Sequence, residues 1–302
     1  QQSRPVVVVL YFNDVLLLLG DGCRLAYADD LKLYFVVRTA EDCIRLQSLL
    51  DVFVEWCHRN KLTVSIPKCM VMSFYRIKQP IIFDYDINGV VLQRTDQFSD
   101  LGVLLDHKLT FSLHRSAVIS KANRQLGFMS KISKDFNDPH CLKALYCSLV
   151  RPILENASLV WFPHQVTWSL RIESVQRKFI RMALRNLPWR DPQNLPPYSD
   201  RCNLLSLDSL ERRRKNQQAV FIAKLLTGET DCPRLLSLLD IRVPPRALRG
   251  GTLLQPRYHR TAFGYNEPLT TMMRTFTAFE DFFEFGETSA HFLARVRHVR
   301  NV

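Results

Sequence analysis

The sequence predicts an α+β fold in which an antiparallel sheet with one packed helix precedes a helical segment and a mainly helical C-terminal region. Before residue 110, short apolar runs alternate with turn signals, which is typical of strands and hairpins. After residue 110, apolar residues recur three and four positions apart, which indicates amphipathic helices. The chain has 302 residues, 47% of them hydrophobic and 23% charged, which is sufficient for a globular core.

A hairpin and a helix are the first predicted elements. Apolar runs on both sides of Asp29–Asp30 indicate a strand, a tight turn and a second strand over residues 24–35. Thr39 and Asp42 have the spacing of a capping box, so a helix is expected to begin there and to end at a left-handed Asn60. The apolar face of this helix is formed by Leu46, Leu49, Leu50, Phe53, Trp56 and Cys57.

Further short strands are expected up to residue 110, separated by Pro80, Asn88-Gly89 and Gly102. The apolar runs are Val71–Phe74, Ile81–Asp86, Val90–Leu92 and Leu101–Leu105.

Three helical stripes follow. They comprise Val118, Ala122, Leu126 and Met129; then Leu142, Leu145, Tyr146 and Leu149; then Ile172, Val175, Phe179, Met182 and Ala183. The second stripe is expected to begin at Asp138-Pro139 and to stop at Arg151-Pro152. Four prolines between 188 and 202 predict a linker, and residues 207–226 predict a helix that carries Arg212, Arg213, Arg214 and Lys215.

Charge divides the chain unevenly. The net charge is +12 and the pI is about 9.5, so a polyanionic partner is expected. Residues 1–110 hold 12 basic and 13 acidic side chains, residues 111–190 hold 13 and 4, and residues 191–302 hold 16 and 12. Most of the excess positive charge therefore lies in the middle segment.

Composition excludes several classes of protein. The content of hydrophobic residues excludes disorder, and the absence of a Cys-x-x-Cys pair argues against zinc and disulfide frameworks. The longest apolar run, Val6–Phe12, is much shorter than the ~20 residues of a membrane span. Because no signal peptide is recognisable either, an intracellular location in nucleus and cytoplasm is expected.

Two adjacent carboxylates, Asp29 and Asp30, lie at the predicted turn. They repel each other, so a positive group is expected beside them. Oxygen ligands on a tight turn suit Mg²⁺, which completes its shell with water and substrate phosphates. The alternative is a solvated loop, because aspartate also tolerates turn geometry.

The surrounding sequence resembles the reverse transcriptases of non-LTR (LINE-type) retrotransposons, in particular the jockey-like arthropod elements. Tyr27-Ala28-Asp29-Asp30 resembles the YxDD hairpin of these enzymes, and Phe12–Val15 resembles the FINDL-like segment before it. Later matches are Phe53–Cys57, Asn60–Leu62, Lys68–Cys69, Asp100–Val103, Leu109–Phe111, His114, Lys121-Ala122, Leu126–Phe128, Leu145-Tyr146, Ser148–Glu155, Val160-Trp161, Arg171–Glu173 and Gln176. The resemblance covers roughly residues 10–187, in order.

The resemblance implies an RNA-directed DNA polymerase. Residues 1–110 would be the C-terminal part of a polymerase palm, 111–187 a basic helical thumb, and 188–302 a linker and tail. Asp29 and Asp30 would be catalytic and would bind Mg²⁺, or alternatively Mn²⁺, for two-metal nucleotidyl transfer. The implied partners are an RNA template, a DNA primer or target and dNTP, without a membrane.

Further roles follow from the same resemblance. Tyr27 would support the primer end, and Lys68 would either contribute phosphate charge or have a structural role. The primer grip would be Asp100, Leu101, Gly102 and Val103. Phosphate contacts of the thumb would come from Lys121, Arg124, Lys131, Arg177, Lys178 and Arg181.

The sequence also departs from the family. The third catalytic carboxylate of these polymerases lies many tens of residues before the hairpin, and neither Asp14 nor Asp21 matches it. We therefore expect this chain to be a fragment that is inactive alone and that needs the N-terminal part of the same polyprotein. The alternative is a decayed or domesticated remnant that acts only as a basic RNA/DNA-binding protein.

Overall fold

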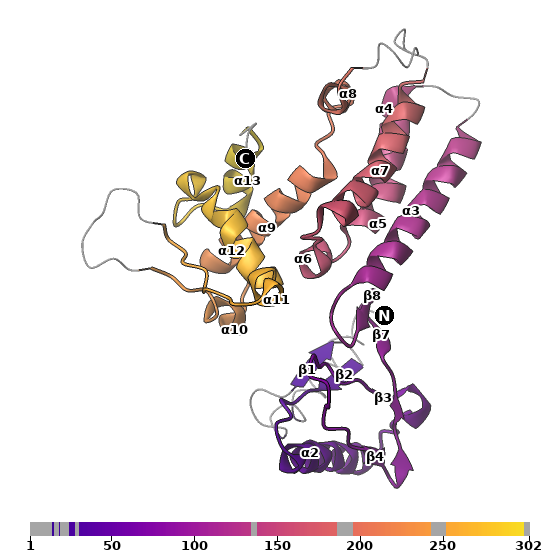
Figure 1. The fold of residues 1–302 in the computed structure, drawn as a ribbon, viewed down its shortest axis with the longest axis vertical. Coiled ribbons are helices and arrows are strands. Elements are labelled where there is room, and N and C mark those ends of the chain that lie inside the picture. Colours follow the sequence, from indigo (N-terminus) through magenta and orange to yellow (C-terminus); the bar gives the residue numbers. More distant parts are fainter. Residues whose placement is uncertain are drawn as a thin grey trace. The chain divides into compact units, whose positions relative to one another are not determined.

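The structure is a computed structural model that describes residues 24–27, 30–133, 138–185, 196–242 and 252–298, together with Asp14 and Leu18. The chain forms two compact units, Gln1–Phe111 and Ser112–Val302 (Figure 1). The described part of the first unit contains strands and one long helix, and that of the second is largely helical, which confirms the predicted α+β class.

Small two-stranded sheets and one long helix make up the described part of the first unit. Its elements are β1 (Arg24–Tyr27), β2 (Asp30–Leu33), α2 (Ala40–Arg59), the 3₁₀ turn η1 (Ile66–Lys68), β3 (Met70–Val71), β4 (Asp86–Ile87), β5 (Val90–Val91), β6 (Gln93–Arg94), β7 (Gln97–Asp100) and β8 (Val103–Asp106). The pairs β1–β2, β4–β5 and β7–β8 are antiparallel, whereas β3 and β6 pair in parallel, so the expectation of one antiparallel sheet is wrong in this respect. In the predicted run Val71–Phe74 only Val71 lies in a strand, and in the predicted run Ile81–Asp86 only Asp86 does.

The predicted hairpin is confirmed on the described residues. In β1 and β2, Arg24 faces Leu33 and Tyr27 faces Asp30. Ala28 and Asp29, between the strands, lie outside the described residues.

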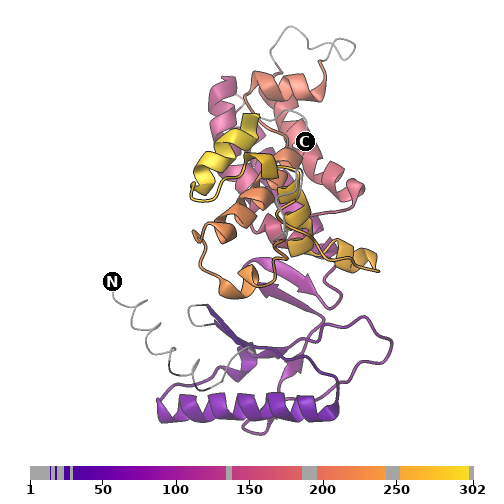
Figure 2. The same ribbon diagram turned by 90° about the vertical axis from the view of Figure 1, so that its left-hand side faces the viewer.

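Helix α2 packs against this hairpin and against β4. Trp56 and Cys57 are buried and pack with Leu31 and Leu33 of β2, because they lie on the predicted apolar face of the helix. Figure 2 shows the long helix α2 running beneath the strands of the hairpin. At β4, the Gln47 side chain donates to the carbonyl oxygen of Asp86 at 2.9 Å and accepts from its backbone N–H at 3.1 Å. The predicted packed helix is therefore confirmed.

Both ends of α2 were predicted, and one prediction is wrong. The capping box of Thr39 and Asp42 is present, with the Thr39 backbone N–H donating to the Asp42 carboxylate at 3.0 Å. At the other end, Asn60 has φ −91° and Lys61 has φ 56°, so the left-handed stop is one residue later. The Asn60 backbone N–H donates to the Trp56 carbonyl oxygen at 3.0 Å and thereby continues the helical pattern by one position, and the Asn60 side chain donates to the same oxygen at 2.8 Å.

The second unit is built from helices. Its described elements are α3 (Ser112–Ile132), α4 (Pro139–Leu145), the π-turn η2 (Tyr146–Val150), α5 (Arg151–Glu155), α6 (Ser158–Trp161), α7 (Val166–Ala183), α8 (Tyr198–Leu204), α9 (Leu210–Leu226), α10 (Pro233–Leu236), α11 (Ala262–Tyr265), α12 (Pro268–Thr277), the 3₁₀ turn η4 (Glu280–Phe282) and α13 (Ser289–His298). The three predicted helical stripes lie on α3, on α4 with η2, and on α7, which confirms these helices. Leu149 of the second stripe is exposed and Val150 is buried in its place, because the π-turn shifts the buried face by one residue.

Two boundaries in this unit differ from the predictions. The second stripe does not stop at Arg151-Pro152, because the wider π-turn of residues 146–150 accommodates the proline and the helix continues to Glu155. The predicted linker overlaps α8, where Cys202 is buried; residues 186–195 lie outside the described part.

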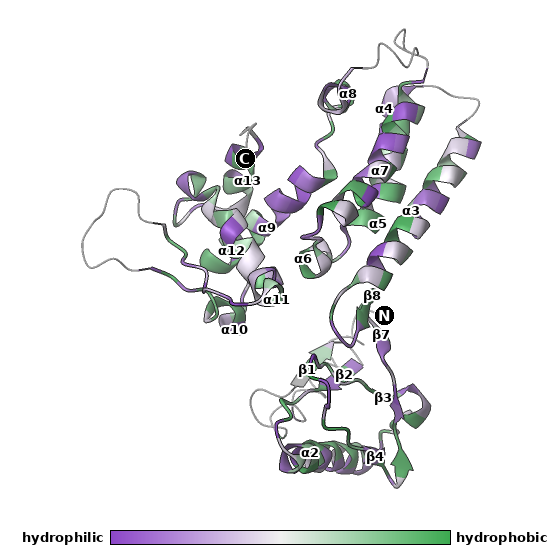
Figure 3. Cartoon of the chain, in the orientation of Figure 1, coloured by the Kyte–Doolittle hydropathy of each residue, from purple (hydrophilic) through white to green (hydrophobic). Residues whose placement is uncertain are grey.

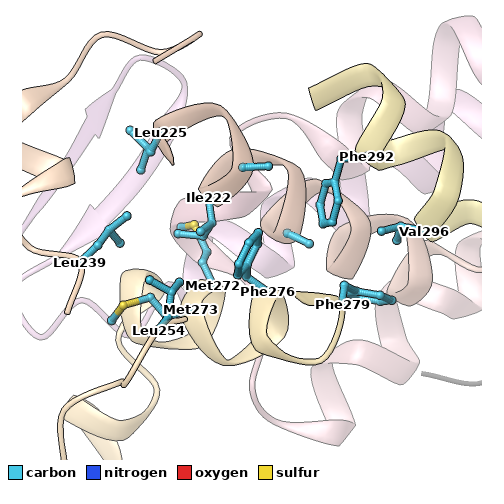
Figure 4. Packing of buried hydrophobic residues seen from close by; sticks show 12 residues of the cluster. Ile222, Leu225, Leu239, Leu254, Met272, Met273, Phe276, Phe279, Phe292 and Val296 are labelled. Carbon is cyan, nitrogen blue, oxygen red and sulfur yellow. The ribbon is translucent and has the colours of Figure 1, made fainter. Parts of the chain in front are cut away.

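The core of the second unit joins α3–α7 to α8–α13. Tyr146 and Phe179 stack with their ring centroids 4.1 Å apart between η2 and α7. Figure 4 shows Ile222 of α9, Met272 and Phe276 of α12 and Phe292 of α13 in a second cluster. Because α9 also contacts α6 and α7, the helices that pack on α9 are joined to the preceding helices.

Candidate functional site

The two described residues that flank the turn of the β1–β2 hairpin are exposed to solvent. Tyr27, at the end of β1, is 63% exposed, and Asp30, its cross-strand neighbour, is also exposed. Asp29, the other predicted ligand, lies outside the described residues. The described part thus has an aromatic side chain and a carboxylate paired across the tip.

Lys32 connects this hairpin to the β7–β8 hairpin. It lies two residues after Asp30 and so faces the same side of β2. Its ammonium group donates to the carboxylate of Asp100, and both side chains are about 70% buried. No described cation pairs with Asp30, so its carboxylate has no fixed counter-charge on the described residues. The structure therefore brings the predicted hairpin and the predicted primer grip together.

The turn of the β7–β8 hairpin is strained. Its central residues, Leu101 and Gly102, have φ of 46° and 83°, as a type I′ turn requires. A left-handed leucine costs ~1–2 kcal/mol, and Leu101 is nevertheless 56% exposed. Val103 is buried and anchors the strand that follows. Because the Leu101 side chain is exposed, its packing does not explain why the chain keeps this strained backbone conformation.

Asp106, at the end of β8, has a structural role that was not predicted from the sequence. Its carboxylate accepts from the backbone N–H groups of Lys108, Thr110 and Phe111 and from the Thr110 hydroxyl, at 2.9 to 3.1 Å. Burial by itself raises the pKa of Asp106, but these hydrogen bonds outweigh burial and hold the pKa below its usual value. The sequence feature that could have indicated this role is an aspartate followed, four and five residues later, by Thr110 and Phe111. Lys68, in η1, is exposed and lies outside this network.

The donor set at the hairpin fits a hard cation. Carboxylates on a turn match the oxygen ligands of Mg²⁺, which typically takes one or two of them from the protein. Among the described residues, no three His, Cys, Asp or Glu side chains gather in a group that could hold a metal ion. Asp29 and Asp30 would therefore need ligands from substrate, water or residues beyond those described.

A basic face lies on α3 and α7, which pack side by side. We use this name for Lys121, Arg124 and Lys131 of α3 with Lys178 and Arg181 of α7, all of which are exposed. The Lys178 ammonium donates to the side-chain oxygen of Asn123 at 2.9 Å and so connects the two helices. None of the five cations pairs with a described carboxylate.

Acidic residues are almost absent from these two helices. α3 has none in 21 residues, and α7 has only Glu173 in 18. Glu173 is buried, and its carboxylate accepts from the backbone N–H groups of Leu210 and Glu211 at 3.1 and 3.3 Å, and from the Tyr198 hydroxyl. The sole carboxylate of α7 thus caps the N-terminus of α9 and does not neutralise the basic face.

Arg177 differs from the other predicted phosphate contacts. It is half-buried and lies over the Tyr198 ring, 4.9 Å from the centroid. Gln176, beside it, donates to the Tyr198 hydroxyl at 3.0 Å and to the Asp208 carbonyl oxygen at 2.9 Å. Burial, followed by the charge of Glu173, raises the pKa of Tyr198 far above its usual value, so its hydroxyl remains a donor. Arg177 therefore takes part in the contact between α7 and α8.

The arginine run, Arg212–Lys215, occupies the hydrophilic first half of α9 (Figure 3). Arg213 forms a two-point ion pair with Glu155, with one N–O distance of 3.0 Å. Arg214 is 1% exposed and donates to the Ser169 hydroxyl at 3.3 Å. The outer two cations lie near carboxylates, Arg212 at 3.7 Å from Asp208 and Lys215 at 3.9 Å from Glu211.

Curated proteins with similar sequences are polymerases of mobile elements. The RNA-directed DNA polymerase from mobile element jockey of Drosophila funebris is 30% identical over 182 residues, which is 56% of this chain and 19% of that protein. The probable RNA-directed DNA polymerase from transposon BS of Drosophila melanogaster is 26% identical over 167 residues, 54% of this chain and 18% of that protein. The predicted resemblance to jockey-type polymerases is confirmed.

The chain spans less than a fifth of the length of these jockey-type relatives. No family model matches the sequence, and no solved structure matches it. None of the described helices is long and apolar enough to cross a membrane.

Several residues that carry the jockey-type resemblance are structural. Tyr146, Glu173 and Gln176 form one buried network, in which the Tyr146 hydroxyl donates to the Gln176 side-chain oxygen at 3.0 Å. Sequence reasoning placed these residues in the thumb without assigning them a role. The sequence could have indicated this structural role, because the polar residues Glu173 and Gln176 lie next to Ile172 and Val175 on the apolar face of the helix.

Proposed function

We propose that the chain is part of an RNA-directed DNA polymerase of a jockey-type non-LTR element, with the Tyr27–Asp30 hairpin as its metal-binding turn. The observation that carries this proposal is the similarity to three polymerases of such elements over 48 to 56% of the chain. The first unit would be the end of the palm, and α3 to α7 would be the thumb.

In this proposal, Asp29 and Asp30 hold Mg²⁺ together with water and the phosphates of the incoming dNTP. Bound ions would supply charge stabilisation of the attacking and leaving oxygens in nucleotidyl transfer. Tyr27 supports the primer end beside Asp30, and the Lys32–Asp100 ion pair holds the β7–β8 turn in register with the hairpin. The basic face binds the phosphates of an RNA–DNA hybrid without reading its sequence.

The metal role can be tested without catalysis by using Mn²⁺ as a paramagnetic probe in NMR. We expect selective broadening of the amide signals of Tyr27 and Leu31, and loss of this broadening in Asp29→Asn and Asp30→Asn. Asp84→Asn, at an exposed aspartate of the same unit, is the matched control. Equal broadening in all four proteins would refute the metal-binding hairpin and favour a protein that only binds nucleic acid.

Catalysis is tested by primer extension on an RNA template in Mg²⁺. We expect no extension by the chain alone, because the resemblance implies a third catalytic carboxylate that neither Asp14 nor Asp21 matches. Extension by the chain alone that is abolished in Asp29→Asn would overturn the expected inactivity and would support the polymerase assignment directly.

A further inference from the structure

An exposed phenylalanine lies among the α3 cations of the basic face. Phe128 of α3 is 56% exposed and points away from the buried residues Ala122, Leu126 and Met129 of the same helix. A single exposed aromatic side chain is ordinary on a protein surface. Its surroundings distinguish Phe128 from such cases.

Three cations of the basic face surround this ring on α3. Arg124 is four residues before Phe128, Lys131 is three after it and Lys121 is seven before it. At 3.6 residues per turn, all three lie within about 60° of Phe128 around the helix axis. None of these three cations pairs with a described carboxylate, so their charges are available to a ligand that contacts the Phe128 ring.

The surface beside the ring is also open. Gly127 is exposed, and a Cβ atom added to it would meet no atom within 4 Å. Ile132, one turn after Phe128, is 43% exposed and extends the apolar contact area. A flat ligand therefore has access to the Phe128 ring from the solvent.

An accessible aromatic ring among unpaired cations is the combination that binds single-stranded nucleic acid, because the cations contact phosphates while a base stacks on the ring. We propose that the basic face binds a nucleic-acid strand with an unpaired base stacked on Phe128, and that it therefore prefers a single strand to a fully paired duplex. This inference rests on the proposed nucleic-acid binding by the basic face: a hybrid would be held through its phosphates alone, and a single strand through its phosphates and one stacked base.

Fluorescence anisotropy at one fixed salt concentration tests this preference. The probes are a labelled RNA strand of about 12 nucleotides and the blunt RNA–DNA hybrid of the same length. Phe128→Leu should weaken binding of the single strand roughly tenfold and change binding of the hybrid less than about twofold, because only the unpaired base loses its stacking partner. Phe128→Trp should retain the affinity of the unsubstituted chain, and Phe74→Leu, at an exposed phenylalanine of the first unit, should change neither affinity.

The outcomes separate this inference from the proposed function. If Phe128→Leu binds the single strand as well as the unsubstituted chain does, while Lys178→Glu with Arg181→Glu abolishes binding, the stacking role fails and the basic face stands. If the charge reversals have no effect either, both the stacking role of Phe128 and the nucleic-acid binding by the basic face are refuted. An altered oligomeric state of Phe128→Leu in size-exclusion chromatography would also overturn the inference, because Phe128 would then be a protein contact.

Discussion

The second unit contains two clusters of positive charge that look similar in the sequence and differ in the folded chain. The basic face on α3 and α7 consists of exposed cations without partner carboxylates among the described residues. In the arginine run of α9, Arg213 pairs with Glu155, Arg214 is buried, and the outer two cations lie near Asp208 and Glu211. Cations that already have partners stabilise a fold, whereas unpaired ones are available to a polyanion, so the two clusters should respond differently to mutation.

The largest expected effect is on the network that positions α9. Glu173→Ala should lower the free energy of unfolding by about 3–5 kcal/mol, because it removes the acceptor of two backbone N–H groups and of the Tyr198 hydroxyl and also the carboxylate that acts most strongly on buried Arg214. Urea denaturation followed by circular dichroism measures this change. Glu211→Ala, at an exposed glutamate, should change the free energy by less than about 0.5 kcal/mol.

A smaller effect is expected for the ion pair between the arginine run and α5. Glu155→Leu and Arg213→Leu should each cost about 2 kcal/mol, because each removes the two-point pair from a mostly buried charge; in Arg213→Leu, Glu155 keeps only its longer contact with Arg151, at 3.8 Å. The double variant should be less destabilised than the sum of the two, by about 1 kcal/mol or more in a double-mutant cycle. Additive losses would show that Glu155 and Arg213 stabilise the fold independently and not as an ion pair. The arginine run would then differ less from the basic face than we propose.

A charge-matched pair of double variants compares the two clusters directly. Lys178→Ala with Arg181→Ala should weaken binding of an RNA–DNA hybrid about tenfold and make the salt dependence shallower by about one to two units of slope. Its stability should change by less than about 0.5 kcal/mol, because both side chains are exposed. Arg212→Ala with Lys215→Ala removes the same charge from α9, and we expect less than about a twofold change in affinity. Equal losses of affinity would mean that net charge, not the basic face, determines binding.

The sequence predicted the local elements better than the contacts between them. The capping box of α2 and the stripes of α3 and α7 follow from spacings of three and four residues, and they are confirmed. The Lys32–Asp100 pair joins residues 68 positions apart, and no periodicity reports such a contact. Likewise, the sequence shows that α7 and α9 are both basic, but only the fold shows which cations have partners.

The candidate site is only partly accessible to sequence reasoning for the same reason. The hairpin follows from the apolar runs around the turn, but its register does not, because Asp30 was expected in the turn and instead lies in β2 opposite Tyr27. The positive φ of Leu101 does not follow, because leucine is a poor predictor of a left-handed turn and the sequence offered Gly102 alone. Arg177 was expected among the phosphate contacts because α7 is amphipathic, but the ring of Tyr198, from the predicted linker, covers it.

The smallest expected effect is a loss of stability in mild acid that leaves the basic face intact. Burial, followed by the neighbouring charge of Arg115, lowers the pKa of His114 below the unfolded value of 6.5. As the pH falls below 6.5, the unfolded chain binds a proton that folded His114 resists, so stability decreases by at most ~1.4 kcal/mol per pH unit until the lowered pKa is reached. His114→Gln should reduce this slope in urea titrations, whereas His140→Gln, at an exposed histidine, should not. Because the basic face consists of lysine and arginine without exposed carboxylates on α3 or α7, its affinity for a hybrid per folded molecule should not fall over the same range. A parallel loss of affinity and stability would show that binding depends on the packing around His114, and the basic face could then not be treated as separate from the core beneath it.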